Sequence, residues 1–91
     1  MSADRSDAAI VGRMIERIRL LIALSDEIPV ETKLNTQALL KMFEASVGAA
    51  AVDASQEAVA SGYYGRLCSD LDAYADLNAL LSALKVFLTY L

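Results

Sequence analysis

Histidine is absent from this 91-residue chain, and cysteine occurs once, at Cys68. Without histidine, zinc sites and acid–base catalysis near neutral pH lose their usual residue. A single cysteine forms neither a disulfide within the chain nor a thiolate metal site. We therefore expect no catalytic residues, no bound metal and no cofactor.

Cys68 is the remaining candidate for nucleophilic chemistry. A reactive cysteine needs a neighbouring base or a positive field to form the thiolate. In this sequence only Arg66 or a helix N-terminus could provide that field. We interpret Cys68 as a small apolar side chain that is buried in the core.

Residues that break regular structure are also scarce, with one proline and four glycines. Apolar and polar residues alternate with a period of two nowhere along the chain, whereas a period near 3.6 recurs, which favours helices over strands. We predict an all-α fold, a small three- or four-helix bundle with a long C-terminal helix. Residues 1–91 form one domain, and we expect residues 1–5 to be flexible.

The first predicted helix begins with an N-cap at Asp4 or Ser6 and ends near residues 25–27. Its main apolar stripe consists of Val11, Met14, Ile15, Ile18, Leu21 and Ile22. Three further apolar residues widen this face, so we expect neighbours on two sides: Ile10, Leu20 and Leu24. Arg13 and Arg17 lie one turn apart on the polar side. Either they bridge to acidic residues of the last helix, or they bind an acidic surface on a partner.

The next segment combines a connection with a second helix. Residues 28–35 form the connection, in which Pro29 suits the first position of a short helical turn. The second helix covers about 37–47, and Gly48 is a suitable stop.

Two interpretations of the following alanine-rich segment stay open. Asp53 followed by Gln56 has the spacing of a capping box, which predicts a third helix over residues 54–60. The alanine content supports one continuous helix over residues 36–61 equally well. In both cases, small side chains would let another helix approach closely.

The strongest periodic signal follows Ser61–Gly65, where two glycines predict a turn. Beyond them the apolar residues step by three and four, which is typical of a heptad seam. The seam consists of Leu67, Leu71, Tyr74, Leu77, Leu81, Leu84, Leu88 and Leu91. It predicts one helix of roughly 40 Å at 1.5 Å per residue. We expect its apolar end to dock either in the bundle or in a partner.

The charge balance excludes some partners. Eight basic and twelve acidic residues give a net charge of −4, which argues against binding to nucleic acid or to an anionic membrane. No apolar run is long enough to span a membrane, and charges interrupt the first apolar stretch where a signal peptide would need its core. We expect a cytoplasmic protein.

The densest acidic group is formed by Asp70, Asp72 and Asp76. Several carboxylates together could bind a divalent cation. On one helix, however, only Asp72 and Asp76 would share a face. We interpret the group as a solvated face rather than a weak ion site.

The hydrophobic content of 56% exceeds what a single small core can bury. We predict a non-catalytic helical protein–protein interaction protein, such as an adaptor, a chaperone-like protein or an inhibitor subunit. It would form a homodimer or join a larger assembly through the apolar seam of its C-terminal helix. The predicted partner-binding residues are Tyr63, Tyr64, Leu77, Leu81, Leu84, Leu88, Leu91, Arg13 and Arg17. The alternative is a small ligand- or ion-binding helical module or an accessory subunit of an enzyme.

Overall fold

The computed structural model describes the backbone of residues 2–91 and the side chains of residues 8–91. Within this part the chain forms four α-helices and a short 3-10 turn, η1, with no strand. The elements are α1 (Ser2–Leu24), α2 (Val30–Ala50), η1 (Ala54–Gln56), α3 (Glu57–Asp70) and α4 (Ala75–Lys85). The prediction of an all-α bundle is confirmed.

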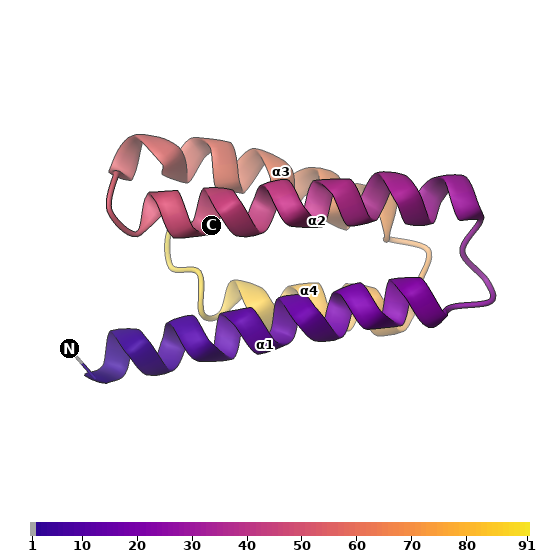
Figure 1. Ribbon diagram of the computed structural model, residues 1–91, viewed down its shortest axis with the longest axis horizontal. Helices are drawn as coiled ribbons and strands as arrows, with labels where there is room; N and C mark the ends of the chain where they lie inside the picture. Colours follow the sequence, from indigo (N-terminus) through magenta and orange to yellow (C-terminus); the bar gives the residue numbers. More distant parts are fainter. Residues whose placement is uncertain (1) are drawn as a thin grey trace.

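The four helices form two layers (Figure 1). One layer contains α2 and α3, and the other contains α1 and α4. Consecutive helices run in opposite directions, so the α1–α2 and α3–α4 connections lie at the same end of the molecule. The Cα atoms extend over 40 × 23 × 16 Å. At 1.5 Å per residue α1 is roughly 35 Å long, so it runs along most of the molecule.

The core lies between the two layers and draws on all four helices. Each helix contributes apolar residues three or four positions apart, so each buries one stripe. The core residues from α1 are Val11, Ile15, Ile18 and Ile22, and those from α2 are Leu39, Leu40 and Phe43. Those from α3 are Tyr64 and Leu67, and those from α4 are Leu77, Leu81 and Leu84. Burying a leucine or isoleucine side chain contributes about 1.5–3 kcal/mol, which makes this cluster the main source of stability.

The prediction of one long C-terminal helix is wrong. The chain leaves the helical conformation at Leu71 (φ −107°, ψ 10°) and is extended at Tyr74 (φ −110°, ψ 99°). The last helix, α4, therefore has 11 residues. It folds back so that its leucines face the same core as Leu67 and Leu71. A single straight helix would leave part of the seam uncovered, and the reversal removes that cost.

Other boundaries also differ from the prediction. The turn predicted at Ser61–Gly65 does not form, because these residues lie inside α3. Helix α2 begins directly after Pro29 and continues past Gly48. The backbone of α1 is helical from Ser2, ahead of the predicted N-caps. Flexibility of residues 1–5 stays a prediction, because their side chains lie outside the described part.

Residues 36–61 belong to two helices, α2 and α3, rather than to one continuous helix. Helix α2 ends at Ala50, and Asp53 caps the next helical turn, as its spacing to Gln56 predicts. The Asp53 side chain accepts a hydrogen bond from the backbone N–H of Ser55 at 3.0 Å. This carboxylate satisfies one of the donors that a helix start leaves free.

The apolar C-terminus docks in the bundle itself. After α4 the chain turns toward the α2–α3 layer (Figure 1). Leu88 is buried, and Phe87, Tyr90 and Leu91 pack against the core. The tail thereby closes the bundle at the end opposite the α1–α2 and α3–α4 connections.

We predict that Gly62→Ala and Gly65→Ala each raise the free energy of unfolding by about 0.5–1 kcal/mol. Both glycines are helical without a positive φ, and a Cβ added at either position would meet nothing within 4 Å. Urea unfolding measures the change. Ala45→Gly, at an exposed position inside α2, is the matched control and should lower stability by a similar amount. A loss of stability in both glycine variants would show that an added methyl group does meet neighbouring atoms at these positions.

Candidate protein-interaction face

Four residues of the predicted binding seam belong to the core of the chain. Leu77, Leu81, Leu84 and Leu88 are 0–3% exposed. Leu91 is half-buried and packs against the same cluster. A partner could reach the buried leucines only if the bundle opened, so in the folded chain they present no surface.

The two predicted tyrosines lie inside α3. Tyr64 is buried, and its hydroxyl donates a hydrogen bond of 2.5 Å to the carbonyl oxygen of Leu81. Its ring lies 5.9 Å from that of Phe43, centroid to centroid. Tyr64 thus connects α3 to both α2 and α4. Tyr63 is half-buried and packs against the core.

Arg13 and Arg17 are exposed on α1. Neither forms the predicted ion pair with the last helix. Among the side chains of residues 8–91, the ion pair is the one between Arg19 and Glu16. The Arg19 guanidinium donates to the Glu16 carboxylate, which holds the pKa of that carboxyl below its usual range.

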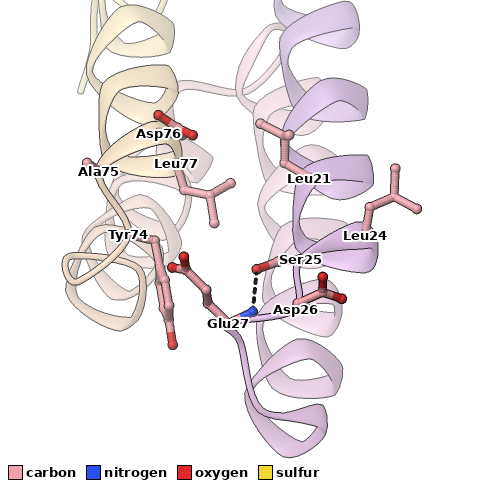
Figure 2. A pocket seen from close by; sticks show the side chains of 9 residues that line it. All are labelled: Leu21, Leu24, Ser25, Asp26, Glu27, Tyr74, Ala75, Asp76 and Leu77. Carbon is pink, nitrogen blue, oxygen red and sulfur yellow. Dashed lines mark hydrogen bonds between the residues drawn. The ribbon is translucent and has the colours of Figure 1, made fainter.

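A hollow of about 480 Å³ lies between the end of α1 and the start of α4. Figure 2 shows Leu21 and Leu77 pointing into the space between these helices, and Leu24 pointing away from α4. The Glu27 carboxylate projects toward Tyr74 across the hollow, and the Glu27 backbone N–H donates to Ser25 Oγ at 3.2 Å. The hollow therefore combines an apolar wall with an acidic rim.

A second hollow, of about 340 Å³, continues along the same seam. It shares Leu21 and Asp76 with the first hollow and adds Arg17, Ala79 and Leu80. The seam between α1 and α4 is therefore recessed along about two turns of α1, from Arg17 to Leu24.

Two large apolar side chains of α1 are exposed near this recess. Leu24 borders the first hollow but points away from α4, and Leu20 lines neither hollow. Leu24 is 77% exposed and Leu20 is 45% exposed. We define the α1–α4 face by these two leucines, the neighbouring arginines and the lining of the second hollow. Its residues are Arg13, Arg17, Leu20, Leu21 and Leu24 of α1 with Asp76, Ala79 and Leu80 of α4.

This face could be found from the sequence only in part. Leu20 and Leu24 lie off the main stripe of α1, which is the signal that they point elsewhere. The prediction of neighbours on two sides assigns them a contact within the bundle, whereas the structure leaves them exposed. The sequence does not indicate which helix lies next to α1, so the recess against α4 was missed.

The end of the bundle beside this face is acidic. No lysine or arginine occurs between Arg19 and Lys33 or between Arg66 and Lys85. Six of the twelve acidic residues lie in these two segments: Asp26, Glu27, Glu31, Asp70, Asp72 and Asp76. Glu31 and Asp76 are in first turns of helices, where the helix dipole favours them. The other four lie at or after the C-terminal ends of α1 and α3, where the dipole disfavours a negative charge.

Three other features could form a site: a cluster of metal-ligating side chains, Cys68, and a groove between α1 and α2. In the described residues no group of three His, Cys, Asp or Glu side chains is placed to hold a metal ion. Cys68 is half-buried and packs against the core. A groove of about 570 Å³ separates α1 from α2, but none of the large exposed apolar residues lines it. None of the described helices is both long and apolar enough to cross a lipid bilayer.

Comparisons with protein-family models, with curated proteins and with solved structures give no match.

We predict that stability falls as the pH rises from about 10 to 12, with Tyr64 as one cause. Burial, followed by the neighbouring Cys68, raises the pKa of Tyr64 to about 12. The unfolded chain loses this proton near pH 10, before the folded chain does, so the stabilisation is complete below pH 10 and disappears above it. Burial also raises the pKa of Tyr90, followed by the charge of Glu57, so Tyr90 adds to the same slope.

Urea unfolding at several pH values tests this prediction. Tyr64→Phe should flatten the alkaline slope and cost about 0.5–1.5 kcal/mol at neutral pH through the lost hydrogen bond. Tyr63→Phe is the matched control on the same helix and should keep the slope of the unmodified chain. An alkaline slope that Tyr64→Phe leaves unchanged would exclude this role of the Tyr64 hydroxyl.

Proposed function

We propose that this protein is a non-catalytic protein–protein interaction module that binds through the α1–α4 face. The observation that carries the proposal is the 77% exposure of Leu24 at the rim of the recess between α1 and α4. Covering apolar surface stabilises a complex by about 25 cal/mol per Å². An exposed leucine beside a concave apolar wall therefore has both parts of an anchor, a side chain to insert and a recess to fill.

The burial of the leucine seam supports binding through the α1–α4 face. Leu77, Leu81 and Leu84 already stabilise the monomer, so they cannot also bind a partner without unfolding. Leu20 and Leu24 contribute little to the core and remain accessible. We therefore propose α1, rather than the C-terminal helix, as the main contributor to the binding surface.

The arrangement of reactive groups supports a non-catalytic role. Asp72 and Asp76 have no third metal-ligating side chain placed beside them. Cys68 has no histidine to activate it, because the chain contains none. A binding role requires none of these groups.

Site-specific photo-crosslinking in cells that naturally express the protein tests this function. A photoreactive amino acid replaces Leu24 in one variant and Val52 in another. Val52 is 89% exposed and therefore a stringent control, because it is at least as accessible to random collisions. We expect a discrete protein adduct at position 24 that is absent at position 52. No adduct at position 24, or the same adducts at both positions, would contradict the proposal.

A further inference from the structure

We propose that the partner of the α1–α4 face is a second copy of this chain, packed with its α1 antiparallel to the first. This inference rests on the proposed function and names the occupant of the same face. It assigns a role to Arg13 and Arg17, which the fold leaves without ion pairs among the described side chains.

Four of the exposed residues of α1 form one continuous stripe, and the paired Glu16 and Arg19 lie beside it. Arg13, Arg17, Leu20 and Leu24 step by four, three and four positions, a spacing that places side chains on one face of a helix. All four are exposed, whereas the opposite stripe of α1 is buried. The stripe therefore has the pattern of a helix–helix contact whose partner is missing.

The charges along this stripe are polarised. Arg13 and Arg17 lie toward its start, and Asp26 and Glu27 follow directly after its end. Asp76 of α4 lines both hollows, one with Asp26 and Glu27 and the other with Arg17, so it lies between the two ends. A twofold axis near Leu20 would bring the basic half of each copy to the acidic end of the other. A parallel pairing would instead place arginine beside arginine, so the charges favour the antiparallel arrangement.

The shapes along the stripe agree with this pairing. With the axis near Leu20, Leu24 of one copy lies opposite Arg17 of the other. Arg17 borders the hollow of about 340 Å³ that is also lined by Leu21 and Leu80. The twofold axis makes this insertion occur twice, so one apolar contact is repeated on both sides of the dimer.

Sedimentation velocity of the full chain over a range of concentrations tests the dimer. Two charge-reversed chains are compared with the unmodified chain: Arg13→Glu with Arg17→Glu, and Asp26→Lys with Glu27→Lys. None of these side chains makes a hydrogen bond or ion pair within the described part, so both variants should fold, which circular dichroism checks. Val52→Asp is the matched control on a surface away from the proposed contact.

We expect the unmodified chain and Val52→Asp to sediment at twice the mass of one chain. Each charge-reversed chain should dissociate at least about tenfold more readily, because like charges then face each other. Mixing the two charge-reversed chains should restore a one-to-one dimer. Added salt should weaken the unmodified dimer, since its ion pairs lie at the rim.

The second-copy proposal is overturned if the unmodified chain stays monomeric at about 100 μM, or if the charge-reversed chains dimerise alone as tightly as the unmodified chain. It is also overturned if mixing them restores no dimer. The proposed function is tested independently by the adduct at position 24. An adduct with a different protein, together with a monomeric pure chain, would refute the second copy and retain the interaction module.

Discussion

The chain reversal between Leu71 and Tyr74 is the constraint on which the rest of the structure depends. It converts a linear leucine seam into two short stripes that face the same core. The Tyr64–Leu81 hydrogen bond holds the two sides of this reversal together. Because the leucines of α4 are covered in this way, the C-terminal helix is a structural element. The surface that we propose for binding lies on α1, whose outer stripe is covered by no other helix in the described part of the chain.

Sequence periodicity predicts the fold class and the buried side of α1. A stripe such as Ile15, Ile18 and Ile22 fits one side of a helix that faces the core. The periodicity fails between α3 and α4 for a physical reason. Leu71, Tyr74 and Leu77 keep the three-and-four spacing across the turn, since residues on both sides of it face one core, and no glycine or proline marks the break. Conversely, Gly62 and Gly65 predict a turn that does not form. A helical glycine costs about 1 kcal/mol, and the burial of Tyr64 and Leu67 outweighs that cost.

The sequence predicts the fold better than it predicts the α1–α4 face. The sequence separates Leu20 and Leu24 from the main stripe of α1, but their exposure depends on which helix packs beside them. Likewise, the net charge of −4 conceals a segregation of charge that only the topology produces. The α1–α2 and α3–α4 connections meet at one end and bring together acidic segments that are far apart in the chain. Arg13 lies at the middle of α1 and Arg17 lies two turns before its C-terminal end, so the outer face of α1 changes from basic to acidic toward that end.

The leucine seam of α4 stabilises the monomer, whereas the exposed Leu20 and Leu24 of the α1–α4 face contribute little to it. Urea unfolding of Leu81→Ala and Leu24→Ala, at a concentration low enough to keep the chain monomeric, tests this difference most directly. Leu81→Ala should lower the free energy of unfolding by about 2–5 kcal/mol, as expected for a fully buried leucine. Leu24→Ala should change it by less than about 0.5 kcal/mol. A small loss for Leu81→Ala and a larger loss for Leu24→Ala would contradict the assignment of core and binding face.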